Sequence, residues 1–133
     1  MLRVQVANQF PAADTLFISI HSNASMNHNA SGFSIYTTPG VTRSDSLATY
    51  IGEEVEKYYT DLNLKLRFDF YSDGDLDREA DFYVLMKTKC PAVLLECLFF
   101  DYWEDYKLLK SAEFQKELAW HVYKGIIKYV ENN

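Results

Sequence analysis

Two polar residues in this sequence follow directly on short apolar runs. His21 comes after residues 15–20 (Thr-Leu-Phe-Ile-Ser-Ile), and Glu96 comes after residues 92–95 (Ala-Val-Leu-Leu). An imidazole in such a place can be a ligand for zinc, and a nearby carboxylate can take a proton from a water molecule that a metal activates. Two structural alternatives stay open. A histidine at a strand end can be a structural hydrogen-bonding group, and a buried glutamate can be held by a partner.

The elements that would position these two residues are central strands. Residues 15–20 and 92–95 are apolar at successive positions, which is typical of strands buried on both faces. In open α/β sheets, sites form where the carboxyl ends of central strands meet the loops. We therefore expect His21 and Glu96 to lie close together at the carboxyl ends of neighbouring strands.

The rest of the chain alternates between predicted helices and strands. We expect the end of a helix at residues 2–8, strands at 33–37, 64–70 and 82–86, and helices at 44–62, 101–109 and 111–130. Asp101 with Glu104 resembles a capping box, and Ser111 can cap the last helix. This order predicts an α/β fold in which a mostly parallel, twisted sheet lies between helices, in a single domain over residues 1–133.

Composition and charge exclude several classes of protein. The net charge of −6 opposes a polyphosphate backbone, so we expect no nucleic-acid partner. No apolar run approaches the roughly 20 residues of a membrane span, so we expect no membrane insertion. Cys90 and Cys97 match neither a redox pair nor a zinc-knuckle spacing and are interpreted as buried small hydrophobic residues. His28 lies in a polar loop and His121 in the last predicted helix; we expect neither to be a metal ligand.

Short segments along nearly the whole chain match one known family in their order. They are residues 19–24 (Ser-Ile-His-Ser-Asn-Ala), 32–36 (Gly-Phe-Ser-Ile-Tyr), 46–48 (Ser-Leu-Ala), Arg78 with 82–85 (Phe-Tyr-Val-Leu), 91–96 (Pro-Ala-Val-Leu-Leu-Glu), and then Phe99, Asp105, 108–109 and 125–126. In these segments the chain resembles the zinc-dependent N-acetylmuramoyl-L-alanine amidases of the type 3 family. The resemblance implies a phosphorylase/hydrolase-like α/β fold and hydrolysis of the amide between N-acetylmuramic acid and L-alanine in peptidoglycan.

The resemblance also implies roles for individual residues. His21 corresponds to the second histidine of the family's zinc site, and Glu96 corresponds to its catalytic glutamate. Asn23 and Arg78 are implied to bind substrate. For Arg78, orientation of Glu96 and a simple surface salt bridge stay open as alternatives. The chain departs from the family beside Glu96, where Cys97 and the residue after it replace the usual Thr-Gly, so we expect a bulkier loop there.

The family's other two zinc ligands are expected upstream of this sequence. The resemblance therefore implies the C-terminal two-thirds of an amidase catalytic domain, without its first strand or strands, and we expect this fragment alone to be inactive. An alternative is an inert peptidoglycan-binding or regulatory module with the same fold, and a zinc peptidase is a third, less well matched reading. We expect the full-length protein outside the cytoplasmic membrane, and we expect this chain to self-associate through exposed strand edges.

Overall fold

The computed structural model describes residues 2–133, in which short strands alternate with helices. The strands are β1 (Phe17–Asn23), β2 (Ser34–Thr37), β3 (Arg78–Glu79) and β4 (Ala92–Phe99). The helices are α1 (Leu2–Ala7), α2 (Arg43–Asp61), α3 (Tyr83–Met86), α4 (Trp103–Leu109) and α5 (Ala112–Asn132), with a 3₁₀ turn η1 at Ala12–Asp14. Across this described range, no helix has the length and apolar character needed to cross a membrane.

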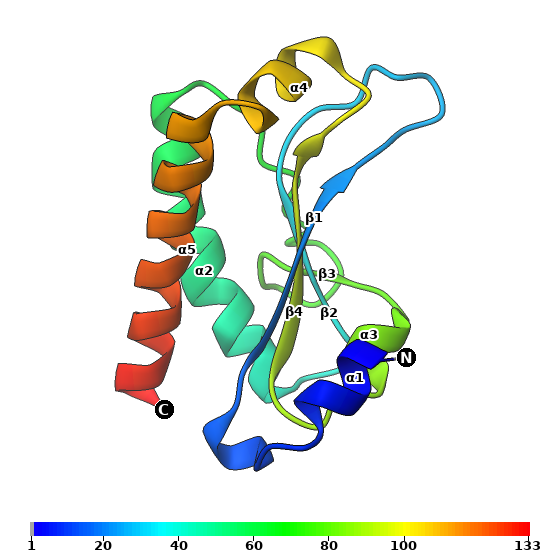
Figure 1. The fold of residues 1–133 in the computed structure, drawn as a ribbon, viewed down its shortest axis with the longest axis vertical. Helices are drawn as coiled ribbons and strands as arrows, with labels where there is room; N and C mark the ends of the chain where they lie inside the picture. The colour runs from blue at the N-terminus through cyan, green and yellow to red at the C-terminus, as the bar shows by residue number, and fades with distance from the viewer. Residues whose placement is uncertain (1) are drawn as a thin grey trace.

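The four strands form one sheet in the order β1-β4-β2-β3 (Figure 1). β4 pairs in parallel with β1 and antiparallel with β2, while β3 runs parallel to β2. β4 lies inside the sheet and is buried on both faces, as its continuous apolar run predicts. The predicted fold class, a mostly parallel sheet between helices, is confirmed.

β1 lies at an edge of this sheet, which differs from the predicted central position. Its residues are mostly half-buried, and the side chain of Ile20 is 68% exposed. An apolar run predicts that both faces of a strand can pack against apolar neighbours. Its place in the sheet depends instead on which strands pair, and that is not encoded in the run itself.

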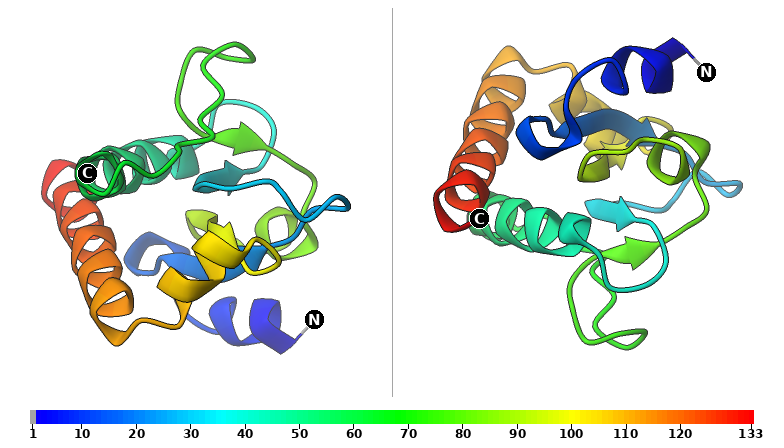
Figure 2. Two further views of the ribbon diagram at one scale, coloured as in Figure 1. Left: turned by 90° about the horizontal axis from the view of Figure 1, so that it is seen from above. Right: turned by 90° about the horizontal axis from the view of Figure 1, so that it is seen from below.

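Helices α2 and α5 pack side by side on one face of the sheet (Figure 2). α2 begins with a capping box. The Thr42 side chain accepts a hydrogen bond from the main chain of the first turn, and the Asp45 side chain accepts one from the main-chain N–H of Thr42. Gly125 of α5 lies in close contact with the main chain of α2. A Cβ atom there would lie 2.5 Å from the Cα of Ile51, so this contact requires glycine.

A cluster of charged side chains joins α2 to α5. Glu54 of α2 is 2% exposed and forms ion pairs with Lys57 at 2.7 Å, with Lys124 at 3.5 Å and with Lys128. His121 lies 3.9 Å from the same carboxylate, which agrees with the structural role expected for it. Burial raises the pKa of Glu54, but the hydrogen-bonded ammonium groups of Lys128 and Lys57 outweigh it and lower the pKa to about 2.

The other face of the sheet is covered at one end by α1 and α3 (Figure 2). Leu85 of α3 packs with Ala92 and Leu94 of β4 in a small second core. The side chain of Asn8, just after α1, donates to the carbonyl of Lys87 and accepts from the N–H of Lys89, each at 2.9 Å. This end of the face is thereby closed, while the end toward the carboxyl terminus of β4 is left for the candidate site.

Two of the predicted strands are wrong. Residues 64–70 form only an isolated bridge between Leu66 and Phe33, because the chain bends away after the main-chain bonds to Phe33. Residues 82–86 form the short helix α3, closed by bonds from the N–H groups of Leu85 and Met86 to the carbonyl of Phe82. In both cases the apolar residues pack on the core without a strand partner.

The predicted capping box at Asp101 is also wrong, since α4 begins after Tyr102 and has no side-chain cap. The Asp101 carboxylate instead accepts hydrogen bonds from the loop that follows β1. The predicted cap at Ser111 is confirmed, because its hydroxyl accepts a bond from the N–H of Phe114. Cys90 and Cys97 are buried free thiols, as expected.

Candidate active site

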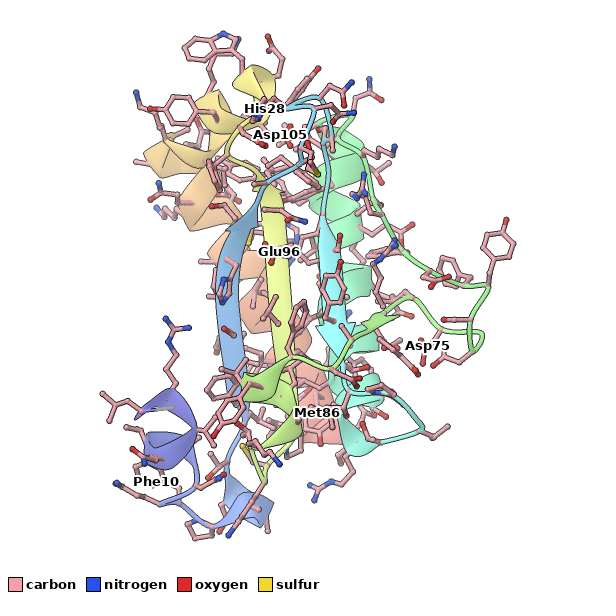
Figure 3. All side chains as sticks on the ribbon, turned by 90° about the vertical axis from the view of Figure 1, so that its right-hand side faces the viewer. Phe10, His28, Asp75, Met86, Glu96 and Asp105 are labelled. Carbon is pink, nitrogen blue, oxygen red and sulfur yellow. The ribbon has the colours of Figure 1, made fainter. Side chains whose placement is uncertain are left out.

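His21, Glu96 and Ser34 form one row across three neighbouring strands. His21 of β1 is the register partner of Glu96 on β4, and Ser34 of β2 is the partner of Glu96 on its other side. Paired residues of adjacent strands point to the same face of a sheet. That face is the one turned away from α2 and α5, and Figure 3 shows Glu96 there, on β4 between β1 and β2.

Both predicted residues lie inside their strands and not just past them. β1 continues from His21 to Asn23, and β4 continues from Glu96 to Phe99. The register shifts between His21 and Asn23, so the strand bends directly after the histidine. The sequence prediction that His21 and Glu96 come together is supported by this register, although the site begins three residues before β4 ends.

Glu96 is a half-buried carboxylate with one oxygen left without a partner. Its Oε2 atom is buried and accepts no hydrogen bond from any residue between 2 and 133. Burial raises the pKa of Glu96 above its ordinary value of 4.5. A raised pKa brings a carboxylate closer to the range in which it exchanges protons efficiently near neutral pH.

His21 is held by a neighbour on its own strand. Its Nε2 atom lies 2.9 Å from the hydroxyl oxygen of Ser19, and the tautomer of the ring decides which of the two donates. Ser19 comes two residues earlier, so both side chains lie on the same face of β1. This contact sets the direction of the imidazole ring before any metal or substrate is bound.

Sequence reasoning did not single out Ser19 and Ser34. The spacing of Ser19 and His21 was a usable signal, because residues two apart on a strand share a face. Ser34 gave no such signal, since its place beside Glu96 depends on the pairing of β2 with β4. Its hydroxyl is buried and has no hydrogen-bond partner within the described chain.

The loop after β1 is tied to the end of β4 by two aspartates. Asp105 is 1% exposed and accepts bonds from the Ser31 hydroxyl at 2.6 Å, the Gly32 N–H at 3.2 Å and the Phe99 N–H at 3.0 Å. Asp101 binds the His28 ring at 2.8 Å, and Figure 3 shows His28 and Asp105 together at this end of the sheet. His28 is therefore directed toward Asp101.

The side chains of Asn23 and Arg78 each form a hydrogen bond with a main-chain group. The side-chain oxygen of Asn23 accepts a bond from the adjacent Ala24 N–H at 2.9 Å. Arg78 is in β3, and its guanidinium donates to the main-chain carbonyl of Arg67 at 3.0 Å. The ion pairs found between residues 2 and 133 do not include Arg78, so it forms no salt bridge there, with Glu96 or with another carboxylate.

The row around Glu96 fits zinc only in part. His21 offers one nitrogen ligand, and Glu96 offers a carboxylate with a free oxygen. A catalytic zinc usually has three protein ligands. Within the described residues, the group of three metal-ligating side chains whose ligand atoms lie within 4.8 Å of one another is Asp45, Asp75 and Asp77, which is elsewhere in the fold. These residues therefore do not complete a zinc site at His21.

Several known proteins are similar to this chain in sequence and in fold. The chain is 26% identical over 161 residues to the N-acetylmuramoyl-L-alanine amidase AmiA of Escherichia coli, with 96% of this chain and 55% of that protein covered. Its structure matches the N-acetylmuramoyl-L-alanine amidase of Clostridium difficile 630 with a TM-score of 0.79 at 25% identity, covering 97% of this chain and 63% of that one.

A second solved structure agrees with this. The amidase AmiC2 of Nostoc punctiforme matches with a TM-score of 0.79 at 28% identity, over 96% of this chain and 63% of that one. The chain thus spans a little over half the length of AmiA and under two-thirds of either solved structure. The family model described as N-acetylmuramoyl-L-alanine amidase (Amidase_3) matches residues 2–128, and the chain belongs to this family.

Proposed function

We propose that this chain is the C-terminal two-thirds of the catalytic domain of a zinc-dependent N-acetylmuramoyl-L-alanine amidase. The reaction is hydrolysis of the amide between N-acetylmuramic acid and L-alanine in peptidoglycan. The observation that carries the proposal is the pairing of His21 with Glu96 on adjacent parallel strands, with the Glu96 Oε2 atom buried and free of partners within residues 2–133.

In this proposal Glu96 moves the proton. It takes a proton from the attacking water and delivers it to the nitrogen of the leaving amine, so that atoms and charge balance across the cleavage. Burial supports this role because the raised pKa of Glu96 makes its conjugate acid able to form and to donate. Ser34 is next to Glu96 in the row, and its buried hydroxyl is free to donate a hydrogen bond there.

His21 would hold the zinc ion through its imidazole. Bound zinc polarises a carbonyl group and lowers the pKa of water, which is the chemistry an amide bond requires. The other two ligands would come from residues that precede this sequence in the full-length protein. Ser19 would fix the orientation of the His21 ring, as such hydrogen bonds do around metal-ligating histidines.

Asn23 and Arg78 are proposed to bind the substrate. Asn23 follows the bend in β1 directly after His21, which places it at the rim of the row. Arg78 would have to leave the Arg67 carbonyl to reach a bound ligand.

We further propose a location and an association state. Because the proposed substrate is peptidoglycan, we propose that the full-length protein acts outside the cytoplasmic membrane. We also propose that this chain associates with copies of itself through β1.

Zinc content and hydrolysis together test the proposal. The chain and the full-length product of its gene are purified, and zinc is measured by elemental analysis beside the His21→Ala variant of each. We expect about one equivalent in the full-length protein, lost in the variant, and muropeptide hydrolysis that disappears in Glu96→Gln while zinc remains. Ser22→Ala, at an exposed neighbour of His21, is the matched control and keeps both.

The same measurements address the inert alternative. The incomplete ligand set within residues 2–133 is the observation that favours it. A full-length protein that binds purified peptidoglycan sacculi without zinc and without releasing free amine would be a wall-binding or regulatory module. That result would overturn the proposed hydrolysis.

A further inference from the structure

Three aspartates converge at the opposite edge of the sheet from β1. Asp45 lies in the first turn of α2, and Asp75 and Asp77 lie in the segment that leads into β3. Each offers a carboxylate oxygen, and the three oxygens lie within 4.8 Å of one another. Figure 3 shows Asp75 on the loop beyond β2, well away from the Glu96 label. We call these three residues the acidic cluster.

Asp77 is a buried carboxylate with an unused oxygen. Its side chain is 0% exposed, and its Oδ2 atom accepts a bond from the Thr37 hydroxyl at 2.6 Å. The Oδ1 atom is also buried and has no hydrogen-bond partner among residues 2–133, and the same holds for Oδ1 of Asp75. A buried carboxylate oxygen without a hydrogen-bond donor is costly, so these oxygens need either a proton shared between Asp75 and Asp77 or a bound cation.

No ion pair in the described chain reaches the acidic cluster. The ion pairs found in the described chain involve Glu54, Asp101 and Glu104, and none of them reaches the cluster. Burial, and then the neighbouring Asp75 carboxylate, raise the pKa of Asp77 to about 7 despite the Thr37 hydrogen bond. Two ionised carboxylates this close in a buried place repel unless one of them is protonated or a cation lies between them.

The surrounding structure holds the carboxylates in place. Asp45 is fixed by the capping box, where its Oδ2 atom accepts from the Thr42 N–H at 2.8 Å. Asp77 is fixed by Thr37 of β2. Gly74, with φ of 94°, turns the chain just before Asp75. Two of the three ligands are therefore positioned by regular elements and the third by a tight turn.

We propose that the acidic cluster binds a divalent cation of the calcium class, which fastens the loop before β3 to the first turn of α2. The donors are all oxygen atoms, which suits a hard cation, and neither an imidazole nor a thiolate is part of the set. The cation neutralises the carboxylates and satisfies the free oxygens of Asp75 and Asp77. The site is separate from His21 and Glu96 and does not depend on the proposed hydrolysis.

The test uses calcium chloride on the whole chain after removal of metals with a chelator. We expect calcium to raise the melting temperature by about 5–10 °C at roughly 100 times its dissociation constant. We also expect terbium luminescence, excited through the tyrosine and tryptophan residues of the chain, to appear on binding and to be displaced by calcium. Asp77→Asn and Asp75→Asn should each remove the calcium-dependent rise and the luminescence.

A matched control separates the site from general screening of acidic charge. Asp61→Asn changes an exposed aspartate at the end of α2 and should leave the calcium response intact. Asp77→Asn keeps the size of the side chain and removes the repulsion, so without calcium it should fold at least as stably as the unmodified chain. The proposal is overturned if calcium leaves the unmodified chain unchanged, or if Asp61→Asn and Asp77→Asn respond to calcium alike.

Discussion

Glu96 is a carboxylate in a setting that disfavours its charge. Its Oε2 atom is buried without a hydrogen-bond partner from residues 2–133, and burial raises its pKa. Ionised Glu96 is therefore less favourable in the folded chain than in the unfolded one, and this cost grows as the pH rises above 4.5. This cost is consistent with the proposed role of Glu96 in proton transfer, which stability alone does not require.

Replacing Glu96 with glutamine separates these two explanations. We expect Glu96→Gln to lower the rate of muropeptide hydrolysis by about 10²–10⁴-fold, because the proton acceptor is removed. The free energy of unfolding at pH 7 should stay equal or rise, since the neutral amide avoids burial of a charge. Urea unfolding and an amine-release assay on the same full-length preparation measure both. A variant that loses stability and keeps its rate would assign Glu96 a structural role.

Helices were predicted more accurately than strands, for a physical reason. The period of apolar residues in residues 44–62 and 111–130 reflects a single buried face, which α2 buries against β2, β4 and α5, and which α5 buries mainly against α2. Residues 64–70 alternate as a strand does, but a strand also needs a partner with free main-chain groups. Phe33 supplies only one such bridge, at Leu66, so the segment stays irregular. Which strands pair depends on segments that are far apart in the sequence, so strand pairing leaves no pattern within one segment.

The contact between α2 and α5 depends on Gly125. We expect Gly125→Ala to lower the free energy of unfolding by about 1–3 kcal/mol, because the new Cβ would lie 2.5 Å from the Cα of Ile51 and main chain cannot turn aside. Gly52→Ala is the matched control in the other helix. There the nearest atoms belong to the Leu76 side chain, which can rotate, so the loss should be smaller. Equal losses in urea unfolding would contradict this account of the helix contact.

The charged cluster at Glu54 makes the same helix pair sensitive to acid. The pKa of Glu54 is lowered to about 2 in the folded chain from an ordinary 4.5, so its stabilisation is complete above pH 4.5 and is lost as the pH falls toward 2. Because solvent screens the partly exposed lysine partners, the difference amounts to about 1–2 kcal/mol. Urea unfolding between pH 2 and 6 should show this slope.

Substitution at Glu54 identifies the source of that slope. Glu54→Gln should be less stable at pH 6, because Lys57 and Lys128 lose their partner, and its stability should fall less steeply toward acid. Glu56→Gln, at an exposed position two residues after Glu54 that takes no part in the lysine ion pairs of the described chain, should keep the slope of the unmodified chain. An unchanged slope in Glu54→Gln would assign the acid sensitivity to other carboxylates.

The candidate site as a whole was only partly accessible from sequence. His21 and Glu96 could be found because each follows an apolar run, and the family resemblance pointed to the same two residues. Ser34 could not, since it joins the row through the pairing of β2 with β4. The acidic cluster was also missed, because Asp45 is about 30 residues from Asp75 and the fold alone brings them together.

The position of β1 at the sheet edge leads to a prediction for the whole molecule. An exposed edge strand offers unpaired main-chain groups to another chain, and Ile20 adds a 68% exposed apolar side chain beside an apolar groove lined by residues of β4 and α5. We expect light scattering to give a mass above the 15.5 kDa of one chain, increasing with concentration.

A charge on β1 tests whether this edge carries the association. Ile20→Lys should return the mass to that of one chain, because a charge on an edge strand opposes pairing. Val41→Lys places the same charge at a 96% exposed position between β2 and α2 and should leave association unchanged. A single 15.5 kDa species for the unmodified chain at all concentrations would show that the β1 edge does not pair.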